Sequence, residues 1–312
     1  MKLKEYFPGL LNYKMEEGSS PKTIQEYTRI IHTILDPAIG DIDLEDIREI
    51  DVGKIKVIGR QHGRYGEQRG VVTFRQLLQY IKKTGLKIPF DWRDLTLPKC
   101  PDKEVDALSK DEWETVRNAF DLNWIIGLRD RALVELLWAT GMRISEALAL
   151  NRDSVPWETK ELSIRNAKPP HQTEKIYFTD ESLYWLRQYL QVRNETFDPL
   201  FVNLTGQRAT PGGVRRTIQT TVKKAGIEKR IHPHLFRSTF VTNLLQGTQD
   251  GAPNTDIKTV QVLARHRSER TTLKHYTAVM KGRAKKEHER VLNQPLPKVE
   301  IDFVKELMFK RN

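Results

Sequence analysis

Apolar residues recur at spacings of three and four along most of the chain, the pattern of helices that bury one face. In the first hundred residues this pattern predicts helices over residues 20–34, 42–50 and 71–83, the first of them ended by Pro37 and Gly40. Residues 53–70 are rich in glycine and basic side chains and fit either a surface loop or a helix–loop junction. We therefore predict a small helical domain at the N-terminus.

Residues 98–106 contain two prolines and charges of both signs, which disfavour helix and central strand, so we predict a linker there. Beyond it, Ser109 and Glu112 are spaced as a helix capping box. Residues 162–164 and 176–178 alternate like the strands of a hairpin. Further helices are predicted over residues 130–139, 143–150, 180–192, 213–225, 239–245 and 257–263. The predicted fold class is mainly α with a small β-sheet.

These elements divide the chain into a helical domain of residues 1–97, the linker, a mixed α/β domain of residues 107–292, and a tail of residues 293–312. The tail holds an amphipathic pattern over residues 301–309 that predicts a last helix. This helix either docks on a neighbouring subunit or folds onto its own domain, and its sequence favours neither.

Positive charge is concentrated in one region of the chain. The formal net charge is +11, whereas residues 205–290 alone hold 18 Lys and Arg against 6 Asp and Glu. Such a basic face fits a polyanion, of which nucleic acid is the commonest, and a solvated surface is the alternative. Residues 53–70 add basic side chains that either face a phosphate backbone or lie on a flexible loop.

The composition favours a cytoplasmic globular protein. Hydrophobic residues make up 38% of the chain and charged residues 30%, which is too apolar for a disordered chain. No apolar run approaches the ~20 residues of a membrane span, and the first residues lack the apolar core of a signal peptide. The single cysteine, Cys100, cannot form an internal disulfide, which fits a reducing compartment.

Residues 266–276 carry the most specific candidate chemistry. Tyr276 follows His266 by ten positions, with arginines and two adjacent threonines between them. A phenol has a pKa near ~10, so it attacks phosphorus only where cations neutralise the phosphate and a base accepts its proton. Basic residues at the ends of other predicted elements are candidates for these groups: Arg143, Lys168, His234 and Arg237.

Taken in this order, the candidates resemble the active-site motifs of the tyrosine recombinases, the phage integrase family. The matching motifs are the first arginine box at residues 140–146, the second box at His234 and Arg237, the third box and nucleophile at His266 and Tyr276, and the hairpin lysine at Lys168. The resemblance covers roughly residues 107–290. It implies a helical N-terminal core-binding domain followed by a mixed α/β catalytic domain of the tyrosine-recombinase type.

The resemblance implies that cationic side chains bind the scissile phosphate. Arg143 and Arg237 would hold its non-bridging oxygens, a task that suits the planar and permanently charged guanidinium group. His266 would add a hydrogen bond to the same phosphate. Glu146, three residues after Arg143, is expected to support that arginine.

The same resemblance implies a covalent pathway. Tyr276 would attack the phosphorus and form a 3′-phosphotyrosine, while His234 accepts the phenolic proton. Lys168 would protonate the departing 5′ oxygen, with Lys175 as its substitute. Because the covalent linkage conserves the energy of the phosphodiester bond, we expect neither ATP, nor another cofactor, nor a metal.

Some features depart from the usual family pattern. Arg265 stands where the family has glycine, so we expect a different local turn. Tyr276 is ten residues after the histidine rather than the common nine, and His275 occupies the ninth place. The loop 246–255 is long, and Lys168 lacks flanking glycines.

Each candidate taken singly has a structural alternative: an ion pair for either arginine, a helix cap for His234, a core position for His266, packing for Tyr276, and a solvated loop for Lys168. Because the candidates occur together and in the order of the family's motifs, a catalytic role is favoured over these structural alternatives. The remaining tyrosines in predicted strands or helices are expected to pack: Tyr177, Tyr184 and Tyr189.

We therefore predict an enzyme, a site-specific DNA recombinase that closes around duplex DNA. By resemblance it would act as a homotetramer on two sites through a Holliday junction, with accessory proteins as further partners. We expect it in the cytoplasm, and on the nucleoid if its source is a prokaryote. A type IB topoisomerase-like enzyme that relaxes DNA is one alternative. A DNA-binding regulator that has lost catalysis is the other.

Overall fold

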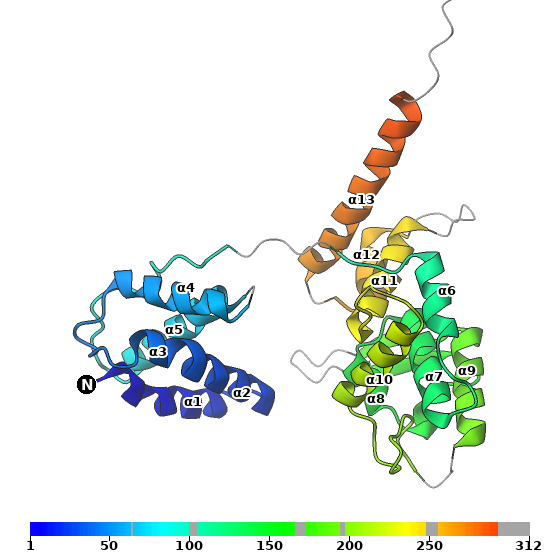
Figure 1. The fold of residues 1–312 in the computed structure, drawn as a ribbon, viewed down its shortest axis with the longest axis horizontal. Coiled ribbons are helices and arrows are strands. Elements are labelled where there is room, and N and C mark those ends of the chain that lie inside the picture. Colours follow the sequence, from blue (N-terminus) through cyan, green and yellow to red (C-terminus); the bar gives the residue numbers. More distant parts are fainter. Residues whose placement is uncertain are drawn as a thin grey trace, which may run out of the picture. The chain divides into compact units, whose positions relative to one another are not determined.

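The chain divides into two units, Met1–Lys103 and Glu104–Asn312 (Figure 1). This computed structural model describes residues 1–63, 65–99, 105–165, 173–193, 197–247, 255–266 and 268–292. Cys100, Lys168, most of the loop 246–255 and the predicted tail helix 301–309 lie outside the described residues.

The first unit is built from helices. Their bounds are η1 Leu3–Tyr6, α1 Phe7–Glu16, α2 Pro21–Ile30, η2 Ile31–Leu35, α3 Asp36–Ile39, η3 Glu49–Asp51, α4 Val52–Gln61 and α5 Gly66–Lys83. The predicted start of α2 is confirmed: Ser20 Oγ accepts the Thr23 N–H at 3.3 Å, and Pro21 occupies the first position. Leu10, Ile34 and Phe74 lie in the shared core of these helices.

Two predictions for this unit were wrong. The segment 42–50 is not a helix but a series of turns that ends in η3, because part of its backbone bonds to the N-terminal residues rather than to a following helical turn. Leu3 N–H donates to Ile42 O at 2.9 Å, and Leu44 N–H donates to Met1 O at 3.0 Å. Of the two residues predicted to end the preceding helix, Gly40 is confirmed as the C-cap residue of α3, whereas Pro37 lies in the first turn of α3, where its missing N–H costs nothing.

Residues 53–70 form a helix–loop junction between α4 and α5, one of the two structures that the sequence allowed. The helices meet closely at Gly59 and Gly66: a Cβ on Gly59 would lie 2.7 Å from the Glu67 Cα, and one on Gly66 would lie 2.1 Å from the Gly59 carbonyl oxygen. Glycine is therefore required at this crossing.

The second unit consists of helices and one hairpin. Its elements are α6 Lys110–Asn118, α7 Ile125–Thr140, α8 Ile144–Ala149, η4 Arg152–Ser154, β1 Glu161–Arg165, β2 Thr173–Tyr177, α9 Asp180–Val192, α10 Pro211–Lys224, α11 Pro233–Gln246, α12 Ile257–Ala264 and α13 Glu269–Leu292. The capping box at Ser109 and Glu112 is confirmed at the start of α6. Helix α7 is buried on nearly all sides and packs against α9 and α11. Trp113 of α6 stacks on Trp138 of α7, with ring centroids 4.1 Å apart.

The two strands form an antiparallel hairpin in which Leu162 pairs with Ile176. Ile176 points into the core, whereas the neighbouring Tyr177 is 48% exposed. Tyr184, on the outer side of α9, is 51% exposed, while Tyr189 is fully buried. The prediction of packing was therefore right for Tyr189 and wrong for the other two tyrosines.

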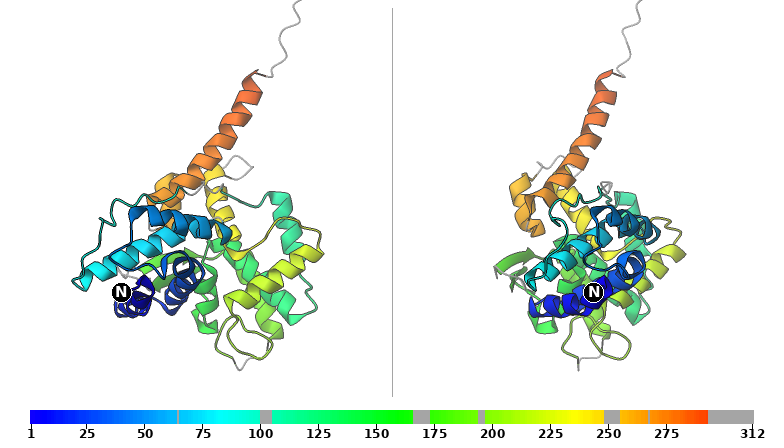
Figure 2. Two further views of the ribbon diagram at one scale, coloured as in Figure 1. Left: turned by 60° about the vertical axis from the view of Figure 1, so that its left-hand side comes forward. Right: turned by 90° about the vertical axis from the view of Figure 1, so that its left-hand side faces the viewer.

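Helices α11, α12 and the first turns of α13 lie side by side (Figures 1 and 2). A separate apolar cluster joins the three helices: Val241, Leu245, Val260, Ala264 and Val279. The mainly α fold with a small sheet is confirmed. Within the described ranges, no helix is long and apolar enough to cross a bilayer.

Candidate active site

Arg143 is the N-cap residue of α8, held by a tight turn. Gly141 ends α7 in the left-handed conformation, with φ of 59°, and this turn leads directly into α8. Glu146 accepts the backbone N–H of Arg143 at 2.9 Å and its Nη1 at 2.6 Å. The predicted support of Arg143 by Glu146 is confirmed, and the Arg143 side chain remains 41% exposed.

Arg237 is buried on the first turns of α11, with 3% of its surface exposed. It donates from Nη1 to Gly141 O at 2.6 Å and from Nη2 to Ala264 O. These bonds connect the end of α7 to the end of α12. Burial, reinforced by the guanidinium groups of Arg143 and Arg265, lowers the pKa of Arg237 to about 9.

His266 follows α12 and is fixed by the helix after it. Its Nδ1 lies 2.8 Å from the hydroxyl of Thr272, which is 1% exposed. The ring of His275 faces it, with centroids 6.2 Å apart. Burial and the nearby Arg237 lower the pKa of His266 to about 4, so its ring is neutral at pH 7 and can donate or accept one hydrogen bond at each nitrogen.

His234 is exposed on the first turn of α11. It lies close enough to His266 and His275 to contribute to the lowered pKa of both rings. His234 is not the cap of this helix, which was its structural alternative. The N-cap residue is the nearby His232, whose Nδ1 accepts the Leu235 N–H at 3.2 Å.

Two predicted residues are not brought into this cluster by a described contact. Tyr276 lies on α13 directly after the buried His275 and is 38% exposed, and its hydroxyl makes no hydrogen bond with any residue that the structure describes. Lys168 belongs to the segment between β1 and β2 that lies outside the described residues. Its substitute, Lys175, forms an ion pair with Glu161 at 2.7 Å.

Sequence reasoning missed the contributions of Arg265 and His275. Arg265 was noted only as a departure from glycine, yet its side chain is 1% exposed and lies 3.0 Å from Glu146. Its φ of 53° is in the left-handed region that glycine favours, although the residue there is an arginine. His275 is 9% exposed, and burial with the nearby His234 lowers its pKa to about 4. The sequence held one signal for these two residues: each is basic and directly precedes a motif residue, Arg265 before His266 and His275 before Tyr276.

The cluster holds more positive than negative charge. Arg143, Arg237 and Arg265 are accompanied by two carboxylates, Glu146 and Glu174, the latter 3.8 Å from Arg265 Nε. An excess guanidinium in a partly buried site attracts a single anionic group such as a phosphodiester. Among the described residues, no group of three or more His, Cys, Asp or Glu could hold a metal ion.

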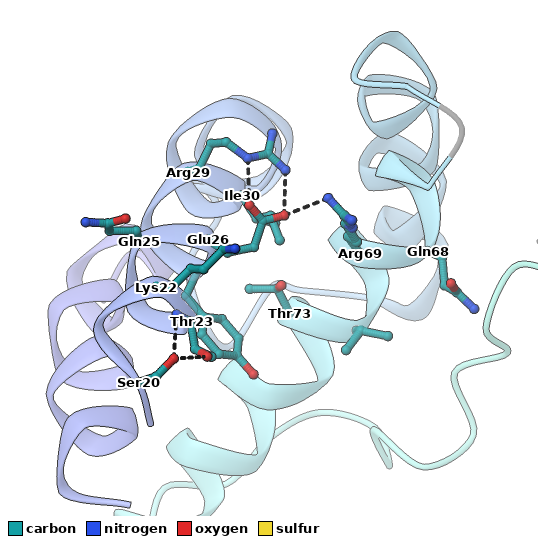
Figure 3. Close-up of a pocket in the computed structure, with 12 residues that line it drawn as sticks. Ser20, Lys22, Thr23, Gln25, Glu26, Arg29, Ile30, Gln68, Arg69 and Thr73 are labelled. Atoms are coloured by element: carbon teal, nitrogen blue, oxygen red, sulfur yellow. Dashed lines mark hydrogen bonds and ion pairs between the residues drawn. The ribbon is translucent and has the colours of Figure 1, made fainter. Parts of the chain in front are cut away.

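A second candidate surface lies on the first unit, in an open groove of about 790 Å³ between α2 and α5. Figure 3 shows Glu26 between two arginines of this groove: Arg29 Nη2 lies 2.9 Å and Arg69 Nη1 lies 2.7 Å from Glu26 Oε1. Lys22 is exposed on the same groove. Three cations against one carboxylate give this groove a positive charge as well.

Comparison with known proteins identifies the family. Residues 107–283, more than half of the chain, match the phage integrase family. The tyrosine recombinase XerC of Alcanivorax borkumensis is 28% identical over 274 residues, which cover 84% of this chain and 85% of that protein. The tyrosine recombinase XerD of Proteus mirabilis is 30% identical over 224 residues, which cover 70% of this chain and 69% of that protein.

The fold is also shared with solved structures. The Tn1549 transposon integrase in complex with transposon right end DNA has a TM-score of 0.73 and 17% identity, and the match covers 94% of this chain and all of that one. The family predicted from the order of the motifs is therefore confirmed, and the chain belongs to the phage integrase family.

Proposed function

We propose that the protein is a site-specific DNA recombinase that cuts and rejoins duplex DNA through a covalent bond to Tyr276. The observation that carries this proposal is the convergence of Arg143, Arg237 and His266, from three separate segments, on one positively charged site. The relatives described above are recombinases, which favours this function over the topoisomerase-like and regulatory alternatives.

The arginines neutralise the scissile phosphate. Two guanidinium groups beside the non-bridging oxygens stabilise the additional negative charge of the pentavalent transition state, and the neutral His266 donates a further hydrogen bond. Partial burial strengthens these interactions because less water screens them. Glu146 limits the mobility of Arg143 and so reduces the entropy lost when the phosphate binds.

The phenol of Tyr276 attacks the phosphorus and its proton passes to His234, whose side chain is exposed. The bond from phosphorus to the 5′ oxygen breaks, and Lys168 supplies the proton that this oxygen needs. A 3′-phosphotyrosine and a free 5′ hydroxyl result. Attack by the 5′ hydroxyl of another strand reverses these steps and rejoins the DNA, so the reaction consumes no ATP.

DNA contacts extend beyond the active site. We assign the groove between α2 and α5 to the DNA-binding surface, because Lys22, Arg29 and Arg69 carry its positive charge on exposed helix positions. Such cations supply affinity through phosphate contacts and release of counterions. The linker of residues 98–106 joins this helical domain to the catalytic domain.

The assembly is a homotetramer on two DNA sites, and strand exchange proceeds through a Holliday junction in the cytoplasm. This part of the proposal follows the family resemblance. The tail helix 301–309 either joins neighbouring subunits or packs on its own domain, and accessory proteins are compatible with both arrangements.

The test is covalent trapping on a nicked suicide duplex whose sequence wild-type protein has selected from a randomised pool, called here the selected duplex. Wild-type protein should form a protease-sensitive DNA adduct, and Tyr276→Phe should bind the duplex without forming it. Tyr177→Phe, at an exposed tyrosine of the same unit, is the matched control and should form the adduct at the wild-type rate.

An adduct that persists in Tyr276→Phe contradicts the assignment of the nucleophile. Binding with no adduct in the wild type supports the inactive regulator instead. Relaxation of supercoiled plasmid by the monomer, with no junction intermediates on paired sites, supports the topoisomerase-like alternative.

A further inference from the structure

Arg265 combines an unfavourable backbone conformation with a buried charge. It is the C-cap residue of α12, with φ of 53° and ψ of 49°. Among described residues other than glycine, only Lys160 shares a positive φ, a conformation that disfavours a bulky side chain. The Arg265 guanidinium is 1% exposed, and burial lowers its pKa. Its Nη2 makes hydrogen bonds, whereas its Nε and Nη1 are buried without one among the described residues.

The side chain of Arg265 secures the turn that presents Arg143. Its Nη2 donates to Glu146 Oε2 at 3.0 Å and lies 3.4 Å from Gly141 O. Glu146 is thereby shared between two arginines, since its Oε1 accepts from Arg143 Nη1 at 2.6 Å. Burial opposes ionisation of Glu146, yet Arg265 and the N–H groups of Arg143 lower its pKa.

The backbone of Arg265 contacts both arginines of the site. Its carbonyl oxygen accepts from Arg143 Nη2 at 3.3 Å and lies 3.5 Å from Arg237 Nη2. The left-handed conformation at this residue sets the direction of that carbonyl. Arg265 therefore contacts α8 through its side chain, and it contacts both α8 and α11 through its backbone carbonyl.

We propose that Arg265 is a positioning residue that holds Arg143 and Arg237 at the separation that one phosphate group requires. This inference rests on the proposed function. The guanidinium keeps Glu146 in place, Glu146 keeps Arg143 in place, and the Arg265 carbonyl joins the two arginines directly. With the side chain removed, Glu146 loses its buried partner and the orientation of Arg143 loosens, while the glycine-compatible turn and the carbonyl remain.

The experiment compares Arg265→Gly and Arg265→Lys with wild-type protein on the selected duplex. It measures the melting temperature, the dissociation constant and the single-turnover rate of adduct formation. Arg265→Gly suits the positive φ, so we expect it to fold and to bind DNA within about threefold of wild type, while the rate falls about 10-fold or more. Arg265→Lys should recover part of the rate, because it can keep the ion pair with Glu146 but not both hydrogen bonds.

The matched control is Arg193→Gln. Arg193 is 4% exposed in the same unit and donates to the carbonyl oxygen of Leu200 at 2.7 Å. Its replacement should lower the melting temperature without a selective loss of rate. A rate loss in Arg265→Gly that merely follows its melting temperature, as in the control, overturns the positioning role.

Coupling to Glu146 supplies a second readout. If Arg265 acts through Glu146, the double variant Arg265→Gly with Glu146→Gln should lose no more rate than the more damaging single variant. If the rate losses of the two single variants multiply in the double variant, the two residues act independently and the proposal is overturned. A wild-type rate in Arg265→Gly overturns this inference alone, whereas the absence of any adduct in wild-type protein overturns the proposed function together with it.

Discussion

At the scale of residues, the site depends on charges that are held in place before DNA arrives. Arg237 bonds to two backbone carbonyls and Arg143 to a carboxylate, so neither guanidinium needs to be ordered by the substrate. Pre-organised donors of this kind stabilise developing charge without reorganising during the reaction. Burial first, and then repulsion by Arg143 and Arg265, lowers the pKa of Arg237 to about 9, and a bound phosphate would relieve the repulsion.

The buried histidines predict a pH dependence of stability. Folding lowers the pKa of His266 and of His275 to about 4, below the value of ~6.5 in the unfolded chain. Between these values the unfolded chain binds protons that the folded chain does not. The free energy of unfolding should therefore fall as pH drops from 6.5 towards 4, by up to about 1.4 kcal/mol per pH unit for each histidine and by less for the partly exposed His266.

Urea unfolding at pH 7 and at pH 4.5 measures this effect in DNA-free protein. His275→Gln removes one of the two groups, so its stability should decline less with acid than that of the wild type. An exposed histidine, His62, provides the control, and His62→Gln should leave the decline unchanged. The same decline in wild type and His275→Gln would contradict the assignment to this ring.

Some residues of the site could be predicted from sequence and others could not. Arg143 follows a glycine turn and precedes a glutamate at the capping distance, so local pattern alone places it at a helix start. Arg265 and His275 carry no such pattern, because their burial results from packing between α8, α11, α12 and α13. The catalytic roles of the six predicted residues remain predictions.

At the scale of elements, α13 carries Tyr276, the proposed nucleophile, directly after the buried His275. Its first turns are anchored by Val279 in the apolar cluster with α11 and α12, and by the bond from Thr272 to His266. Tyr276 lies between these anchors on the more exposed side of the helix. We infer that these anchors fix the helix on both sides of Tyr276, while the tyrosine itself remains 38% exposed.

Thr272→Val should weaken this anchor without adding bulk. The Thr272 hydroxyl lies 2.8 Å from His266 Nδ1, and its loss leaves a partly buried ring nitrogen without that partner. Loss of one such bond is worth about 0.5–1.5 kcal/mol, so adduct formation should slow about 2- to 10-fold at unchanged DNA affinity. Single-turnover trapping on the selected duplex measures it.

Thr277→Val serves as the control on the same helix, since the exposed Thr277 hydroxyl donates only to the Leu273 carbonyl, one turn earlier. It should react at the wild-type rate. If both valine variants slow the reaction equally, the effect comes from the helix in general, and the link from Thr272 to His266 has no special role.

Most helices could be predicted because apolar periodicity and capping residues are local signals. α9 has the predicted bounds, and α6 begins at the predicted capping box. The prediction of a helix over residues 42–50 was wrong because part of this backbone forms hydrogen bonds with residues near the N-terminus. Apolar periodicity does not report such long-range pairing. The prediction that Tyr177 and Tyr184 are packed was wrong for a related reason. The sequence pattern identifies a strand or a helix, but it does not show which face the core covers.

At the scale of the whole molecule, two separate units both carry positive charge suited to DNA. If the groove between α2 and α5 contacts phosphates, Lys22→Gln should weaken binding to all duplexes and reduce the slope of log affinity against log salt by about one. Fluorescence anisotropy over a range of salt concentrations measures this slope.

Lys4→Gln is the control in the same unit, because Lys4 lies outside the groove and its Nζ is 2.7 Å from Asp41. It should leave the slope unchanged. An equal change in both variants would mean that general charge, rather than the groove, governs binding. Apolar periodicity predicted the helical domain, two prolines predicted the linker, and the resemblance of the motifs implied the catalytic domain; these boundaries remain a prediction.

The central claim is that guanidinium groups neutralise one scissile phosphate for attack by Tyr276. Replacing that phosphate by an uncharged methylphosphonate tests it most directly, with adduct formation by wild-type protein and Arg143→Ala as the measurement. We expect Arg143→Ala to be impaired by about 100-fold or more on the natural duplex and by far less on the methylphosphonate, whose transition state carries one negative charge fewer. An equal deficit on both duplexes would contradict it.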